Sequence, residues 1–167
     1  MKHRESSKPS SDLPGILQTE KGPIPVCNGR IPLRKILEAS SSAAALVDVY
    51  RTRVLVQNTR TIRLLGKKCP AKILHTLLGY EVQASYKRIH CPDLVTARYL
   101  KLFTELGCHS IRLPYDPTLT GELITEFEAM IDHITKQVAE FFPQDPALQR
   151  YVVRNLFAIL RQQLVGD

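Results

Sequence analysis

The chain has 167 residues, of which 44% are hydrophobic and 23% are charged, a mixture that is typical of a globular domain and excludes wholesale disorder. Residues 1–72 hold 14 Lys and Arg against 5 Asp and Glu, whereas residues 117–167 hold 4 against 7. This asymmetry is typical of proteins that bind nucleic acid or another polyanion. No run of about 18 apolar residues occurs, and the N-terminus lacks an apolar signal segment, so we expect no membrane span and a cytoplasmic protein.

Residues 1–29 are rich in Ser, Pro, Lys and Gly and show neither helical nor strand periodicity. This composition predicts a flexible N-terminal tail, followed by a single domain over residues 30–167. Pro32 stands near the start of a short apolar stripe, which predicts a short helix that ends in the serine run at 40–42.

The segment at about 50–68 predicts a basic β-hairpin. Residues 50–56 alternate and are rich in β-branched side chains, residues 57–59 form a turn signal, and residues 61–65 supply a second strand. Val47, Tyr50 and Val54 also fit a helix, so strand and helix remain open over residues 46–66. A β-ribbon with arginines on its exposed face can follow a phosphate backbone. The predicted polyanion-binding residues are Arg51, Arg53, Arg60, Arg63, Lys67 and Lys68.

Three stretches then repeat a pattern of strand, proline and helix. The prolines are Pro70, Pro92 and Pro117, and Gly79 and Gly107 follow the first two predicted helices, at 71–78 and 94–106. Proline early in a helix and glycine just past its end are favoured, because proline lacks an N–H that would be unpaired there and glycine tolerates the left-handed cap. The repeated pattern predicts β-α units and at least partly parallel strands.

Apolar residues recur at helical spacing through the last third of the chain, with a break at the sequence FPQDP. They predict a helical hairpin at about 119–165. Together these elements predict an α/β (mixed α+β) domain with a small sheet, β-α units in its middle and a C-terminal helical hairpin. The alternative is an all-α domain with a helix-turn-helix-like core built from residues 73–103.

His-Cys and Cys-His pairs flank the predicted helix 94–106, as His90–Cys91 and Cys108–His109. A helix of that length spans about 20 Å, whereas zinc ligands must lie within about 2.3 Å of one point. We therefore expect no shared metal site, no disulfide between Cys91 and Cys108, and four free thiols including Cys27.

The carboxyl ends of parallel strands, where helix N-termini also lie, are a common place for ligands. In the predicted β-α units this position is a possible ligand rim formed by Cys69, Cys91, Asp93, Tyr115 and Asp116. Asp93 and Asp116 are also natural N-cap residues, a role that needs no ligand.

Cys69 and Cys91 each precede a proline at a predicted helix start, where the helix dipole and nearby lysines would lower the pKa of a thiol. The sequence GKKCPAK resembles the Cys-Pro motif of the small sulfur-carrier proteins of tRNA thiolation, although Lys72 stands where that family has a second proline. The resemblance implies a β-α-β-α order over residues 61–113 and a sulfur-carrying thiol at Cys69.

The chain contains no G-x-S-x-G, Walker, G-x-G-x-x-G or H-E-x-x-H motif, so we predict no catalytic residue and no cofactor. The favoured function is that of a non-enzymatic regulatory or adaptor protein that binds nucleic acid or an acidic protein through the basic hairpin. The C-terminal helices would then support a possible homodimer. The alternatives are a thiol-based carrier or enzyme that uses Cys69 or Cys91, and a structural protein–protein interaction module.

Overall fold

The computed structural model describes the backbone of residues 33–165 and the side chains from Glu38 to Leu164. The chain divides after Arg30 into two units, and all described residues belong to the second. The predicted N-terminal tail lies outside the described residues. The elements in chain order are α1 (Leu33–Val49), the π-helical turn η1 (Tyr50–Val54), β1 (Thr59–Arg63), β2 (Ala71–Thr76), β3 (Gly79–Ala84), β4 (Lys87–Cys91), α2 (Leu94–Leu106), β5 (Ser110–Pro114), α3 (Pro117–Phe141) and α4 (Pro146–Val165).

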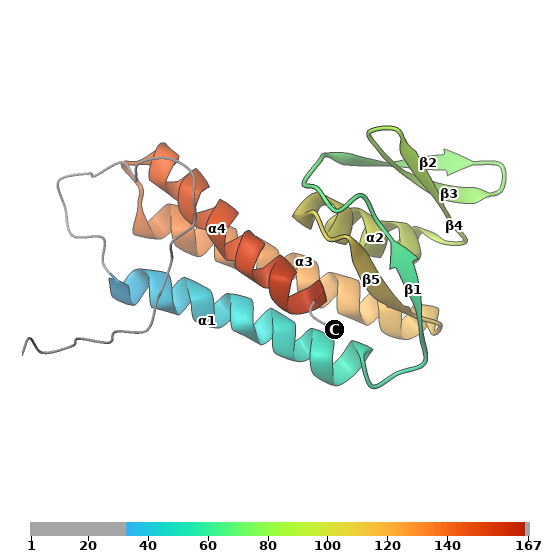
Figure 1. The fold of residues 1–167 in the computed structure, drawn as a ribbon, viewed down its shortest axis with the longest axis horizontal. Coiled ribbons are helices and arrows are strands. Elements are labelled where there is room, and N and C mark those ends of the chain that lie inside the picture. The colour runs from blue at the N-terminus through green and yellow to red at the C-terminus, as the bar shows by residue number, and fades with distance from the viewer. Residues whose placement is uncertain (1–32, 166–167) are drawn as a thin grey trace, which may run out of the picture. The chain divides into compact units, whose positions relative to one another are not determined.

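This order confirms the mixed α+β class and the C-terminal helical pair, and within residues 33–165 it comprises four α-helices and two small antiparallel sheets. Figure 1 shows α1, α3 and α4 alongside one another, and α2 between α3 and the three-stranded sheet. No helix within the described part of the chain combines the length and the apolar character needed to cross a membrane.

α1 is longer than the sequence analysis predicted. Apolar residues that face the core recur every three or four positions through the serine run, and this buried stripe comprises Ala39, Ala43, Leu46, Val47, Tyr50 and Val54. The helix therefore continues to Val49 and passes directly into η1, where the N–H of Leu55 donates to the carbonyl of Tyr50 at 3.2 Å. The predicted strand at 50–56 was wrong, because burial of the 3.6-residue stripe outweighs the β propensity of the branched side chains.

β1 does form, but its partner is distant in sequence. It pairs with β5 in antiparallel register, with Thr61 opposite Arg112 and Ile62 opposite Ile111. The predicted hairpin at 50–68 was therefore wrong. A strand finds its partner through burial of one face, and the apolar partner of Ile62 lies nearly fifty residues further along the chain.

β2, β3 and β4 form an antiparallel meander in the order β2-β3-β4. The predicted helix at 71–78 was wrong, and so were the parallel strands. Alternate residues of β2 and β3, including Ala71, Val82 and Ala84, are buried in the core that α2 shares with the sheet. Gly79 begins β3 after a tight turn at φ +117°, and a Cβ there would lie only 2.9 Å from the carbonyl oxygen of Cys91, so this glycine ends no helix.

The other two predicted units keep their helices. α2 spans Leu94–Leu106, as the sequence predicts, with the carboxylate of Asp93 accepting from the Thr96 N–H at 2.7 Å. Gly107 ends α2 in the left-handed region at φ +84°. Asp116 caps α3 in the same way as Asp93 caps α2, accepting from the Thr118 N–H at 2.8 Å.

Two buried tyrosines join the helices to the β1–β5 sheet. The N–H of Arg112 donates to the hydroxyl of Tyr50 at 2.9 Å, and the hydroxyl of Tyr99 donates to the carbonyl of Arg112 at 2.9 Å. These two backbone groups lie on the free edge of β5, on the side away from β1. In a larger sheet a third strand would pair with them there. The rings of Tyr50 and Tyr99 also contact Phe103, at centroid distances of 6.0 and 4.8 Å. Burial raises the pKa of Tyr50 to about 12, so its hydroxyl stays neutral.

Replacing Tyr50 with Phe is expected to lower the free energy of unfolding by about 1–3 kcal/mol, because the N–H of Arg112 would remain buried without an acceptor. Urea unfolding followed by circular dichroism measures this loss. Tyr115 is 66% exposed, so Tyr115→Phe provides the matched control and is expected to change stability by no more than about 0.5 kcal/mol. Equal stability of the two variants would show that the Tyr50 hydroxyl does not support β5.

Candidate polyanion-binding site

The structure distributes the six predicted polyanion-binding residues over several elements. Arg51 and Arg53 lie on η1, and Arg53 forms ion pairs with Glu122 at 3.0 Å and Glu126 at 2.5 Å. Arg60 and Arg63 are exposed on β1, and Lys67 and Lys68 are exposed in the loop between β1 and β2. Arg53 is thus neutralised by α3, and the other five cations do not share one ribbon.

The β1–β2 loop is fixed against the end of α2. The N–H of Leu64 donates to the carbonyl of His109 at 2.7 Å, and that of Gly66 to the carbonyl of Cys108 at 3.0 Å. A Cβ on Gly107 would lie 2.6 Å from the backbone nitrogen of Lys68, so the loop passes directly over the glycine cap. Lys67 and Lys68 are therefore held at the C-terminus of a helix, where free carbonyls favour positive charge.

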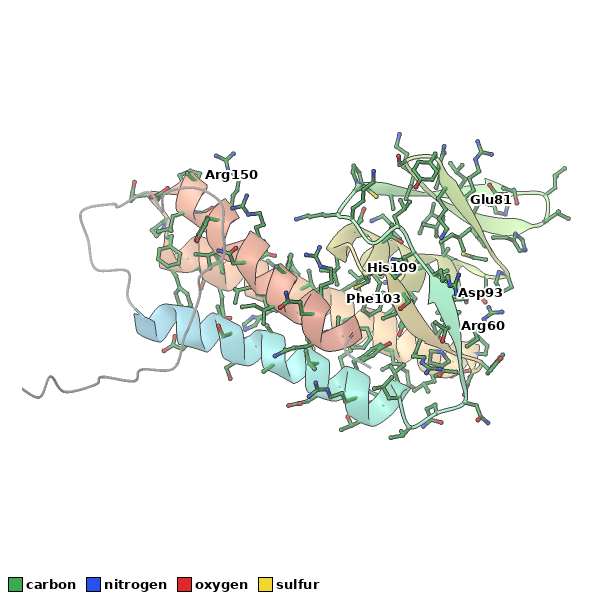
Figure 2. All side chains as sticks on the ribbon, in the orientation of Figure 1. Arg60, Glu81, Asp93, Phe103, His109 and Arg150 are labelled. Atoms are coloured by element: carbon green, nitrogen blue, oxygen red, sulfur yellow. The ribbon has the colours of Figure 1, made fainter. Side chains whose placement is uncertain are left out.

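α4 brings further cations to the same place. Its sequence contains Arg150, Arg154 and Arg161 and no acidic residue. These positions differ by four and seven residues, so all three fall on one stripe of the helix, roughly 16 Å long from first to last. Figure 2 shows Arg150 pointing outward from the first turn of α4. At the other end, Nη1 of Arg161 lies 2.9 Å from where a Cβ on Gly107 would be, beside Lys68.

Two aromatic rings lie among these cations. The ammonium of Lys68 is 5.7 Å from the centroid of Phe157, and the guanidinium of Arg154 is 5.6 Å from the centroid of Tyr151. Both distances fall within the range of cation–π attraction, which orients the two cations over α4. The resulting surface, called the basic face below, consists of Lys67, Lys68, Arg150, Arg154 and Arg161 with Tyr151 and Phe157.

Acidic side chains are engaged elsewhere in the molecule. α3 carries Glu122 and Glu126, which pair with Arg53, Glu128, which pairs with Arg98, and Asp132, which pairs with Lys136 at 2.6 Å. Within residues 38–164, no cation of the basic face forms an ion pair. Internal pairing therefore consumes much of the acidic charge of the C-terminal third, and among residues 38–164 the cations of the basic face have no ion-pair partner.

The arginines of α4 were not among the residues predicted to bind a polyanion. Residues 117–167 are acidic in total, and this total conceals a segregation between α3 and α4. A signal was present, since residues 146–165 hold three arginines on one helical stripe and no acid. The contact between α4 and Lys68, by contrast, depends on how α4 packs against the β1–β2 loop, which no local pattern shows.

The structure separates Cys69 from the other residues of the predicted ligand rim. Asp93 and Asp116 are occupied as N-caps, and Tyr115 is exposed beside the latter. Cys69 adjoins the loop residues that cover Gly107, at the C-terminal end of α2, while Cys91 precedes the N-terminal end of the same helix. The 13 residues of α2 separate the two thiols by roughly 20 Å. A ligand-binding role for Cys91, Asp93, Tyr115 and Asp116 stays a prediction.

The environments of Cys91 and Cys108 work against reactive thiolates. Cys91 and Cys108 are fully buried, and burial raises the pKa of Cys91 to about 11 and that of Cys108 to about 12. Cys69 is half-buried and leads into strand β2, so it does not stand at the start of a helix as the sequence predicted. Among residues 38–164, the structure contains no group of three or more His, Cys, Asp and Glu side chains that could hold a metal ion.

Comparisons with protein-family models, curated proteins and solved structures found no match to this chain.

Iodoacetamide is expected to label Cys69 in the folded chain at pH 8 while Cys91 and Cys108 stay largely unmodified. The thiolate is the nucleophile, and a folded-state pKa of about 11 or 12 keeps these two thiols protonated until the pH approaches that value. Peptide mass spectrometry measures each rate, with the urea-unfolded chain as the control in which all cysteines react. Rapid labelling of Cys91 in the folded chain would instead restore it as a candidate reactive thiol.

Proposed function

We propose that this protein is a non-enzymatic regulatory or adaptor protein that binds nucleic acid through the basic face, without reading its sequence. The observation that carries the proposal is the acid-free helix α4, whose three arginines lie on one stripe that ends beside Lys68. Lys and Arg side chains that contact phosphates supply the sequence-independent part of nucleic-acid affinity. In this proposal the basic face replaces the predicted hairpin as the binding surface.

The chemistry of the basic face favours phosphate over carboxylate partners. Arginine predominates on α4, and its planar guanidinium suits phosphate oxygens as a two-point donor. The stripe of roughly 16 Å would follow about five nucleotides at 3.4 Å per nucleotide of one strand. Protein partners usually bind through a central apolar anchor. Among the described residues of α4, Ile159 is the exposed large apolar side chain, with 42% of its surface accessible, so α4 offers little apolar surface for such an anchor.

A homodimer through the C-terminal helices remains a prediction. The apolar stripe of α4, from Leu148 to Leu164, is buried within the chain's own core, so it supplies no argument for a second copy. A cytoplasmic location likewise stays a prediction, and nucleic-acid binding does not depend on it.

Binding of a fluorescein-labelled RNA duplex is expected to weaken steeply with salt. Five phosphate contacts correspond to a slope of about −4 to −5 in a plot of log K against log salt concentration. The double variant Arg150→Gln with Arg154→Gln is expected to reduce the magnitude of this slope by about 2, because two contacts are lost. Fluorescence anisotropy at several KCl concentrations measures both slopes.

The matched control is Lys101→Gln with Lys136→Gln. It also removes two positive charges, but from lysines that pair with Glu105 and Asp132 outside the basic face. This control is expected to keep the slope of the unchanged protein. Equal slopes for the two double variants would show that only net charge matters. Binding of polyglutamate as tight as that of the duplex would assign the basic face to an acidic protein partner instead.

A further inference from the structure

A hollow of about 470 Å³ lies between η1, the outer face of the β1–β5 sheet and the end of α4. Its polar lining consists of Gln57, Asn58, Thr59, Thr61, Ser110 and Arg112. Tyr50, Leu55 and Leu164 provide the apolar part of its wall, and Ile111, which belongs to the core, completes the lining. The volume falls within the range of small-molecule binding sites.

The polar side chains converge because of the strand register. Thr61 stands opposite Arg112, and Arg63 opposite Ser110, so Thr61, Arg112 and Ser110 project from the same face of the two strands. The opposite face, which carries Ile62 and Ile111, packs on the core. The π-helical turn ends next to the outer face and continues into Gln57 and Asn58, and π-helical turns occur frequently at functional sites.

Among residues 38–164, the lining offers hydrogen-bond donors and no Asp or Glu. Arg112 supplies a guanidinium, Gln57 and Asn58 supply amide groups, and Thr61 and Ser110 supply hydroxyls. In the part of the chain that the structure describes, these side chains make no hydrogen bond or ion pair with another protein group. A set of unengaged donors around one cation is suited to the oxygens of an anion.

We propose that this hollow is a binding site for a small anionic metabolite, whose phosphate or carboxylate group contacts Arg112 and the hydroxyls of Thr61 and Ser110. The apolar wall formed by Leu55 and Leu164 would accommodate the uncharged part of such a molecule. Arg112 does not belong to the basic face, so this site does not depend on nucleic-acid binding.

The backbone of β5 is independent of the charge of Arg112. The tyrosine hydroxyls bind the N–H and the carbonyl of this residue, and its side chain takes no part in those contacts. Arg112→Gln therefore removes the cation of the hollow while the tyrosine contacts stay in place. Thr61→Val, on the opposite strand, provides a second variant that removes a hydroxyl at nearly constant volume.

The test is a titration of the 15N-labelled full chain with inorganic phosphate, AMP, adenosine and succinate, followed by amide chemical shifts. We expect at least one of phosphate, AMP and succinate to shift the amides of Thr61, Ser110 and Arg112, with affinities of about 1 mM or tighter. Shifts with phosphate or AMP alone would indicate a phosphate ligand, and shifts with succinate alone would indicate a carboxylate ligand. Adenosine, which carries no anionic group, is expected to leave these amides unchanged.

Arg112→Gln is expected to weaken the anion about tenfold or more, and Thr61→Val to weaken it by a smaller factor. Arg154→Gln removes the same charge from the basic face and is expected to leave the affinity unchanged. The proposal is overturned if none of the anions shifts these amides, if adenosine acts as strongly as AMP, or if Arg154→Gln weakens binding as much as Arg112→Gln.

Discussion

Two tyrosine hydroxyls form the hydrogen bonds that a neighbouring strand would otherwise form with the free edge of β5. Tyr50 accepts from the N–H of Arg112, and Tyr99 donates to its carbonyl, so one residue of β5 is tied to η1 and to α2 at once. This contact explains why the π-helical turn and a two-stranded sheet can coexist: a buried edge with unpaired backbone groups would be costly, and the hydroxyls remove that cost. With β5 fixed, β1 is placed beside it and the β1–β2 loop is carried over the end of α2.

That placement determines the electrostatics of the surface. The loop brings Lys67 and Lys68 to the C-terminus of α2, and α4 adds its arginines along a line that ends there. Four of the five acidic residues of α3 pair with Arg53, Arg98 and Lys136 instead. A chain whose C-terminal third is acidic in total thus presents a positive helix next to a largely neutralised one. The hollow beside η1 arises from the same framework, because the strand register sets Thr61 and Arg112 side by side.

The candidate site could be predicted only in part. The basic segment at about 50–68 predicts Lys67 and Lys68 as polyanion-binding residues, and the basic face includes both. The same segment predicts Arg53, which instead pairs with Glu122 and Glu126, more than sixty residues away in sequence. The α4 arginines were hidden by a charge total that averaged over two helices. Charge composition counts cations, whereas pairing between elements decides which of them remain available to a ligand.

Elements whose signals are local follow from the amino-acid sequence alone. Asp93 and Gly107 bound α2 because an N-cap and a left-handed C-cap act within one helical turn, and the apolar periodicity of α3 and α4 is likewise complete within each helix. The other features depend on contacts between residues that are far apart in the chain. Residues 50–54 are helical and residues 71–84 form a hairpin because of what they are buried against, and the pKa values of Cys91 and Cys108 are raised by that same burial. Strand partners and buried environments are supplied by residues far away in the chain, and no local pattern contains them.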